Sequence, residues 1–537
     1  MSDDGAVGGN GAVGGARPGP PRRRPARRRY TGRRRARGTG RVLVRAASIA
    51  AVVVASSAFT TGHVVDPHAS GARPNIVFVL TDDLARNLVT KQFMPNLAAL
   101  EQQGTTFTNY FVADSLCCPS RATIFTGRFP HDTGVFTNRG PNGGYRTFNR
   151  HGDQRSTIAT DLHAAGYRTA MMGKYLNRYH PSDPPAPGWD TWDVADWGYP
   201  EYNYSLNDNG KVVHYGGPNV PGKDNYLTDV LSGFADSFVS GSVARHPTKP
   251  FFLEVATFAP HAPYTPAPRY ANLYPHLAYP RTPAFGAKNT AAPAWLRNVP
   301  ALSAKDRSSI ATAFRRRAQA VKSVDDLIGN LVSTLRSTGA LANTYFVFSS
   351  DNGLHMGEHR LMPGKLTAFD TDIHVPLIVV GPRVPPGTSV TSFAENVDLR
   401  PTFDALAGLH PGEPVDGRSL APLIFGAGPG ARAPAGWRQG VYVEHMGPVS
   451  DAADDPDRPD RFSGNPTSYI ALRLRSALYV QYGDGEHEYY DLRRDPYELH
   501  NVYASLPASR KAALRAEALR LKACHDRPAC SDVRAVV

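Results

Sequence analysis

Residues 117 to 128 read Cys-Cys-Pro-Ser-Arg-Ala-Thr-Ile-Phe-Thr-Gly-Arg, a segment in which reactive and anion-binding residue types lie close together. Pro119 suits the first turn of a helix and Gly127 suits its end, which places Cys117 at a helix N-terminus. Unpaired backbone N–H groups and the helix dipole attract anions there, and the planar fork of Arg121 matches a tetrahedral oxyanion. The alternative is a buried cysteine pair beside a capped helix, because cysteine is among the most often buried residue types.

Polar residues also follow four apolar runs, at residues 75–80, 167–172, 251–257 and 344–349. The run 75–80 lacks alternation and the run 344–349 repeats its pattern, which is typical of parallel strands buried on both faces. Ligands bind outside the carboxyl ends of such strands, so we expect the residues that follow the runs to converge. These residues are Asp82, Asp83, Lys174, His261, Asp351 and Asn352. Taken singly, each has an ordinary alternative as a helix cap, a solvated turn or a surface residue.

Four of these residues offer only oxygen atoms as ligands: Asp82, Asp83, Asp351 and Asn352. Oxygen ligands are the set that a hard cation such as Ca²⁺ or Mg²⁺ prefers, whereas a zinc site would use histidine or cysteine. The pattern therefore predicts an all-oxygen cation site at the carboxyl edge of the sheet.

The spelling Cys-x-Pro-Ser-Arg at residues 117–121, followed by Thr126-Gly127-Arg128, resembles the signature of the type I sulfatases. The resemblance implies that a formylglycine-generating enzyme oxidises Cys117 to formylglycine (3-oxoalanine), whose hydrate is the nucleophile; Cys118 takes the variable position. It also implies an alkaline-phosphatase-like α/β fold, with a mixed sheet flanked by helices and a smaller C-terminal antiparallel-sheet subdomain.

The same resemblance implies roles for the other candidate residues. Ca²⁺, or Mg²⁺, is expected to be bound by Asp82, Asp83, Asp351, Asn352 and residue 117. Sulfate binding is expected from Lys174, and assistance to the leaving alcohol from His261 and Lys365, the last within the segment 362–366. Arg121 is a further candidate catalytic residue, which the maturation enzyme is also expected to recognise.

One position departs from the family pattern. Many sulfatases have Lys-x-His at the first lysine, and that histidine helps the formylglycine hydrate to expel sulfate. In this sequence the lysine is Lys174, and Leu176 occupies the position of the histidine. His355, four residues after Asp351, is the candidate substitute, and the alternative is an ordinary loop histidine.

The spelling Lys-Tyr-Leu-Asn at 174–177 is typical of the N-acetylglucosamine-6-sulfatase-like branch, as are the segments 187–190 and 204–210. The likeness covers roughly residues 73 to 503 and implies a sulfated saccharide as substrate. The alternatives are an arylsulfatase, a phosphonate or phosphate ester hydrolase of similar fold, and a noncatalytic glycan-binding protein.

Composition limits the partners. The 537 residues carry a formal net charge of +13, but residues 1–45 hold thirteen arginines and only Asp3 and Asp4 as acids, so that they account for +11. The remainder is nearly neutral, and Tyr30 is the single aromatic residue of the basic tail. We therefore expect no nucleic-acid partner. Nothing in the sequence indicates the oligomeric state.

The N-terminal region predicts export. Residues 1–72 combine a basic tail with an apolar stretch of small residues at 46–59, the pattern of an export signal that is either cleaved or retained as an anchor. Cys524 and Cys530 are close enough in sequence to form a small disulfide loop in an oxidising compartment, the alternatives being free thiols or a metal pair. The predicted location is secreted or extracytoplasmic.

We expect a catalytic domain at 73–435 and a C-terminal subdomain at 436–537. Helical periodicity at 303–335 places Asp325 and Asp326 on a helix, where we expect them to be solvated or structural. Short strands are predicted after residue 440. Aromatic residues at 189–215 are expected to form a satellite core or to stack on sugars. The aspartates of the loop 450–466 lack the spacing of a calcium loop, so a solvated linker is predicted.

Overall fold

Strand β1 (Asn75–Thr81) lies in the middle of a large mixed sheet and is buried on both faces. Its parallel neighbours are β8 (Phe251–Ala256) and β9 (Thr344–Ser350), and β4 (Arg168–Gly173) pairs with β8 in the same direction. These are the four strands that the apolar runs predict. Because they are parallel and adjacent, their carboxyl ends meet at one edge, as expected.

Ten strands form this sheet, in the order β11-β2-β10-β9-β1-β8-β4-β5-β6-β7. Beyond β4, the strand β5 (Thr191–Asp196) is parallel and leads into an antiparallel hairpin of β6 (Tyr204–Asp208) and β7 (Lys211–Tyr215) that turns at Asn209 and Gly210. Beyond β9, the strand β10 (Leu377–Val380) runs antiparallel to β9 and to β2 (Thr105–Phe107). The edge strand β11 (Thr388–Val390) is parallel to β2.

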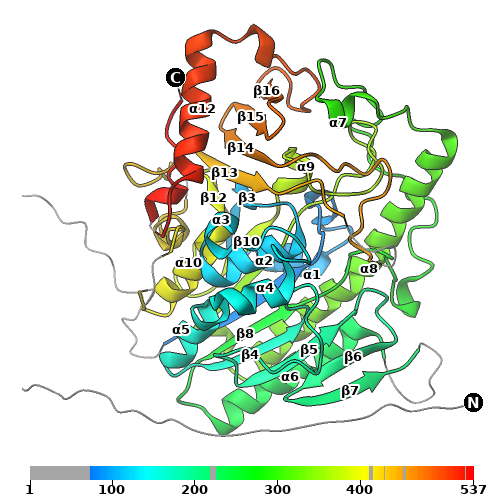
Figure 1. Cartoon of the computed structure of the whole chain (residues 1–537). Coiled ribbons are helices and arrows are strands. Elements are labelled where there is room, and N and C mark those ends of the chain that lie inside the picture. Colours follow the sequence, from blue (N-terminus) through cyan, green and yellow to red (C-terminus); the bar gives the residue numbers. More distant parts are fainter. Residues whose placement is uncertain are drawn as a thin grey trace, which may run out of the picture. The chain divides into compact units, whose positions relative to one another are not determined.

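Helices cover both faces of the sheet (Figure 1). One apolar core packs against α2 (Cys117–Thr126), α4 (Gly144–His151), α5 (Ile158–Ala164) and α10 (Leu399–Leu406). A second packs against α1 (Pro95–Glu101), α6 (Leu227–Arg245) and α8 (Ala304–Ser337). Side chains of β1 alternate between the two cores, which is why this run shows no polar face.

A separate four-stranded antiparallel sheet follows in the chain, in the order β13 (Gly440–His445), β14 (Tyr469–Leu474), β15 (Ala477–Tyr482) and β16 (His487–Asp491). Leu514 and Ala518 of α12 (Ala508–Lys522) pack on this sheet. Together the two sheets confirm the predicted fold class. A disulfide joins Cys524 to Cys530, which confirms the preferred interpretation of that pair.

The remaining elements are short. A small parallel pair joins β3 (Tyr110–Phe111) to β12 (Ala394–Glu395). Short helices lie at α3 (Pro130–Thr133), α7 (Ala294–Arg297), α9 (Asp370–Ile373) and α11 (Ala421–Phe425). Single 3₁₀ turns lie at Arg86–Leu88, Asp153–Arg155, Pro268–Tyr270, Leu341–Asn343, Asn396–Asp398, Tyr503–Ser505 and Pro528–Ser531.

Two minor predictions are confirmed. Asp325 on α8 is structural, because its carboxylate accepts hydrogen bonds from the backbone N–H groups of Asn96 and Leu97 at the start of α1. Trp192 is buried in the core beside the partly buried Trp189, so this pair serves packing.

The computed structural model describes residues 73–217, 225–410, 415–428, 430–450, 455–526 and 528–536. The predicted tail and export signal, and Asp451 and Asp454 of the acidic loop, lie outside these residues. Within the described part of the chain, no helix combines the length and the apolar character that crossing a membrane requires.

Candidate active site

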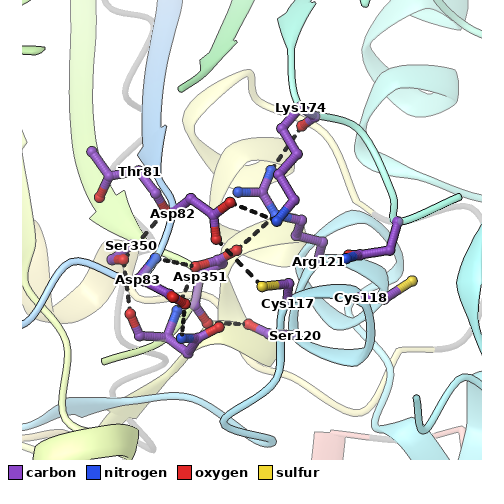
Figure 2. A network of polar contacts seen from close by, with 12 residues as sticks. Thr81, Asp82, Asp83, Cys117, Cys118, Ser120, Arg121, Lys174, Ser350 and Asp351 are labelled. Carbon is purple, nitrogen blue, oxygen red and sulfur yellow. Dashed lines mark hydrogen bonds and ion pairs between the residues drawn. The ribbon is translucent and has the colours of Figure 1, made fainter. Parts of the chain in front are cut away.

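Helix α2 begins at Cys117, and its C-terminus is set by Gly127, whose φ of 67° is in the left-handed region that glycine adopts most easily. All side chains of this helix are buried. Figure 2 shows the Cys117 thiol turned toward Asp82, while the Cys118 side chain points the other way. The Cys117 Sγ lies 3.3 Å from Asp82 Oδ1, whereas Cys118 is part of an apolar core. The two adjacent cysteines therefore face different environments.

The surroundings of Cys117 disfavour the thiolate form of its side chain. Burial raises the pKa of Cys117 well above its ordinary value, and the nearby carboxylates of Asp457 and Asp82 raise it further. Direct nucleophilic attack needs a thiolate, so this environment is unsuited to ordinary cysteine catalysis.

The ends of β1 and β9 bring four oxygen-bearing residues together. The backbone N–H of Asp83 donates to Asp351 Oδ1 at 3.1 Å, and Asn352 Nδ2 donates to Asp83 Oδ1 at 2.7 Å. Asn352 Oδ1 is buried and has no hydrogen-bond partner among the described residues. A buried carbonyl oxygen without a donor is costly, and a cation would satisfy it. The four predicted ligands thus fit a hard cation.

Crowding of the carboxylates supports the same conclusion. Burial raises the pKa of Asp351 to about 6, and the neighbouring Asp82 adds to the rise. The pKa of Asp82 is lowered instead, because Lys174, His261 and other cations outweigh its burial. Like charges held this close favour either a proton or a metal ion between them.

Four cationic side chains surround this cluster. Lys174 Nζ lies 2.5 Å from Asp82 Oδ2, and Arg121 Nε lies 2.8 Å from Asp351 Oδ2. A second guanidinium N–H of Arg121 donates to the Lys174 carbonyl at 2.7 Å, so Arg121 holds two parts of the site in place. Lys365 Nζ lies 2.7 Å from Asp83 Oδ1 and 2.8 Å from Cys117 Sγ.

His261 completes this group. Its Nδ1 lies 2.8 Å from the Ala262 carbonyl, and its Nε2 lies 3.3 Å from Asp83 Oδ2. The pKa of His261 is raised because Asp83, Asp82 and Asp457 outweigh the effect of burial. A raised pKa and an Nε2 that faces the cluster suit His261 to donate a proton there.

Similarity to known proteins identifies the family. Residues 74–409 match the Sulfatase family, and residues 357–522 match the family described as N-sulphoglucosamine sulphohydrolase, C-terminal. The chain belongs to the sulfatase family. It is a sulfuric ester hydrolase by membership of that family, and the resemblance derived from the motifs is confirmed.

Individual sulfatases align over most of the chain. The N-acetylglucosamine-6-sulfatase of Capra hircus is 33% identical over 492 residues, 86% of this chain and 85% of that protein. The extracellular sulfatase SULF-1 homolog of Drosophila melanogaster is 33% identical over 377 residues, 70% of this chain and 33% of that protein. A solved structure in complex with its substrate D-glucosamine-2-N,6-O-disulfate has a TM-score of 0.67, at 23% identity, over 84% of this chain and 97% of that one.

His355 pairs through its backbone with Gly364, the residue before Lys365, but its ring is bound by residues outside the acidic cluster of this sulfatase. Its Nδ1 lies 2.9 Å from Asp372 Oδ1 and its Nε2 lies 2.9 Å from the Ser463 carbonyl. Both ring nitrogens are thus engaged, one with Asp372 on α9 and the other with the loop that carries Ser463. These contacts give no support to His355 as the replacement for the missing Lys-x-His histidine.

Asp457 is a site residue that sequence reasoning missed, and the prediction of a solvated linker is wrong at this position. Its buried carboxylate lies 2.8 Å from Lys365 Nζ and 2.8 Å from His261 Nε2. The carboxylate also accepts hydrogen bonds from Asn177 at 2.8 Å and Tyr199 at 3.1 Å. The pKa of Asp457 is held well below its ordinary value because Lys365, His261 and Lys174 outweigh its burial.

Nothing in the sequence separates Asp457 from the other aspartates of its loop. The loop lies 340 residues beyond Cys117 in the chain, yet Asp457 Oδ1 is 3.5 Å from the Cys117 thiol. Asn177 follows Leu176, the position at which the chain departs from the Lys-x-His pattern, and its amide donates to Asp457. This asparagine is the sequence feature that comes nearest to a signal for Asp457. A cavity of about 580 Å³ lined by Asp83, His261, Lys365 and Asp457 opens beside these residues.

Proposed function

We propose that this sulfatase hydrolyses sulfate monoesters of sugars and uses residue 117, after oxidation of its thiol to formylglycine, as the nucleophilic position. The observation that carries the proposal is the placement of Cys117 at the N-terminus of α2, 3.3 Å from Asp82 and 2.8 Å from Lys365. An anion that reaches residue 117 meets the positive end of the α2 dipole and the Lys365 ammonium group at the same time.

We also propose Ca²⁺, with Mg²⁺ as the alternative, as the cofactor. Asp82, Asp83, Asp351, Asn352 and residue 117 would hold it. The all-oxygen donor set and the unpartnered Asn352 Oδ1 support this assignment. When bound, the cation supplies positive charge against the sulfate oxygens, and the hydrated aldehyde of residue 117 supplies the attacking oxygen.

The chain's own side chains would then divide the remaining work. Lys174 and Lys365 bind the sulfate oxygens, since both ammonium groups lie against the cluster and remain charged: ion pairing raises the pKa of each despite burial. His261 holds a proton at Nε2, where it can assist departure of the alcohol. Arg121 positions Asp351 and the Lys174 backbone.

The substrate class follows from similarity. The chain is 33% identical to an N-acetylglucosamine-6-sulfatase over most of its length, which supports a sulfated sugar. Maturation requires a formylglycine-generating enzyme as partner, and the basic and apolar N-terminal segments support export. We retain 1–72, 73–435 and 436–537 as the proposed division of the chain.

Mass spectrometry of the peptide that spans Cys117 and Cys118, combined with a hydrolysis panel, tests this function. Protein from the native host should carry the aldehyde at position 117 alone, and Cys117→Ala should abolish turnover. The panel sets glucosamine-6-sulfate against aryl sulfates, phosphate esters and phosphonate esters. Active protein with an unmodified Cys117 would refute the mechanism, and turnover of phosphonates alone would refute the sulfated substrate.

A further inference from the structure

A second cavity, of about 740 Å³, lies beside the active site and is lined by an unusual number of cationic side chains. We propose that this arginine groove, defined by Arg139, Arg146, Arg150, Arg178, His180 and Trp197, binds further anionic groups of a sulfated oligosaccharide whose terminal sulfate ester occupies the active site. The inference rests on the proposed function and specifies its substrate: a chain of sugars with several negative charges.

Local structure explains why the arginines point into one space. Arg146 and Arg150 lie four residues apart on α4, so they share one face of that helix, and both are exposed. Arg178 follows the end of β4, and Trp197 follows the end of β5, the neighbouring parallel strand. The groove therefore lies at the same edge of the sheet as the active site.

A smaller cavity of about 50 Å³ shares lining residues with the groove and with the active-site region. It is lined by Lys174, Asn177 and Tyr199, which belong to the active-site region, and also by Arg178, Asp196 and Trp197, which line the groove. The shared lining residues place the groove next to Lys174, on the side toward the helix α4. A monosaccharide sulfate is too short to occupy both the groove and the active site.

The groove has the chemistry that a sulfated saccharide requires. Even without Arg139, the three arginines Arg146, Arg150 and Arg178 stand against two carboxylates, Asp196 in the lining and Asp455 beside Arg178, so a net positive charge remains. Planar guanidinium forks bind sulfate or carboxylate oxygens in pairs. Trp197 is 37% exposed, with Arg178 Cζ 6.0 Å from its ring, so one aromatic face can stack on a sugar. Arg178 also pairs with Asp455, beside the Asp457 that lies in the active site.

The first experiment compares two double variants. Arg146→Ala/Arg150→Ala removes two charges from the groove, and Arg493→Ala/Arg494→Ala removes two charges from side chains that are 78% and 89% exposed elsewhere. With a heparin-derived tetrasaccharide that ends in 6-O-sulfated glucosamine, the groove variant should lose about tenfold in kcat/KM through KM, because two charge-assisted contacts are lost. Its kcat/KM on glucosamine-6-sulfate should stay within about twofold of the wild type. Equal losses on both substrates, or equal losses in the control variant, would overturn the proposal.

The second experiment uses binding, so that it remains informative if hydrolysis is not observed. Cys117→Ala protein carrying the groove substitutions should bind the tetrasaccharide more weakly and with a smaller salt dependence than Cys117→Ala protein alone. Trp197→Ala should weaken binding without changing the salt dependence. Failure of the wild type to hydrolyse any sulfated sugar would refute the proposed function, whereas undiminished binding in the groove variant would refute the subsite. Equally tight binding of a single-stranded oligonucleotide would refute the proposal that the arginine groove prefers a saccharide.

Discussion

At the residue scale, the charge balance of the active site depends on Asp457. Its carboxylate lies against Lys365 and His261, the side chains that a sulfate group would need to approach. An internal carboxylate at that position competes with the substrate anion. We therefore expect it to lower the affinity of the site for sulfate esters and for the sulfate product.

Asp457→Asn should lower KM for a sulfate ester and tighten inhibition by inorganic sulfate by roughly tenfold, because a charged competitor for the two cations is removed. Steady-state kinetics with added sodium sulfate measure both effects. Asp460→Asn is the matched control, since Asp460 is an exposed residue of the same loop. An unchanged inhibition constant in Asp457→Asn, or an equal change in Asp460→Asn, would show that Asp457 does not compete with sulfate.

The cation site gives a second prediction at this scale. Chelation should lower both activity and Tm, and Ca²⁺ or Mg²⁺ should restore them better than Zn²⁺. A ligand at a hundredfold excess over its Kd stabilises by about 2.7 kcal/mol. Asn352→Leu removes the unpartnered amide oxygen, so the Tm of this variant should respond much less to Ca²⁺. Thermal unfolding with and without added ion provides the measurement. Restoration by zinc alone would contradict an all-oxygen site.

At the scale of elements, the sequence predicted the site residues whose positions are set by the end of a strand or by the start of a helix. The run 75–80 reads as a buried strand because its side chains enter two apolar cores. Cys117 was placed at a helix start because Pro119 and Gly127 fix the helix limits. Residues that follow β1, β4, β8 and β9 could be grouped because those strands are parallel neighbours.

Contacts made by loops across the chain could not be predicted in the same way. Asp457 reaches Cys117 from a loop without regular periodicity, and its neighbour Asp460 is exposed although the residue type is identical. His355 was favoured because it follows Asp351 closely, yet its ring is held by Asp372 and Ser463. Spacing along the chain says little once the backbone leaves regular structure.

His131 on α3 links three elements and gives a prediction on pH. Its Nδ1 lies 2.7 Å from Glu444 of β13, and its Nε2 lies 2.9 Å from the carbonyl of Cys524. Burial opposes the charge, but Glu444 outweighs it and raises the pKa of His131 to about 9 from 6.5. Because the folded pKa lies above the unfolded one, this stabilisation is complete below about pH 6.5 and is lost as the pH rises through about 9.

A rise in the pKa of His131 from 6.5 to about 9 corresponds to a contribution on the order of 3 kcal/mol to the free energy of unfolding. Chemical denaturation between pH 6 and pH 10 should show the wild type losing stability across this interval. His131→Gln should be less stable at pH 6 and should show a flatter profile, because glutamine does not titrate. Parallel profiles for the two proteins would mean that His131 is not the group responsible.

At the scale of the whole molecule, the C-terminal sheet is part of the active site rather than an appendage. The loop between β13 and β14 supplies Asp457, and Glu444 of β13 donates its backbone N–H to the Ala113 carbonyl at 2.8 Å. One apolar core includes Ala113 and Phe129 from the catalytic part together with Tyr442 and Leu472 from the small sheet. The two parts therefore share a core as well as a site.

A chain truncated after residue 435, the boundary that the sequence predicts, should consequently fail to fold into a stable enzyme. Truncation exposes Ala113, Phe129 and Val397, which lie in the shared core, and removes the carboxylate that pairs with Lys365 and His261. The loss of several buried apolar contacts lowers the free energy of unfolding by several kcal/mol. Folded proteins are typically stable by only about 5–15 kcal/mol, so such a loss is enough to unfold the fragment. We expect the fragment 73–435 to be insoluble or to unfold without a cooperative transition, while the fragment 73–537 unfolds in a single one. Calorimetry of both fragments makes the comparison. A soluble 73–435 fragment with a cooperative transition near that of the longer chain would show that the catalytic part folds alone, and its activity would then measure directly what Asp457 contributes.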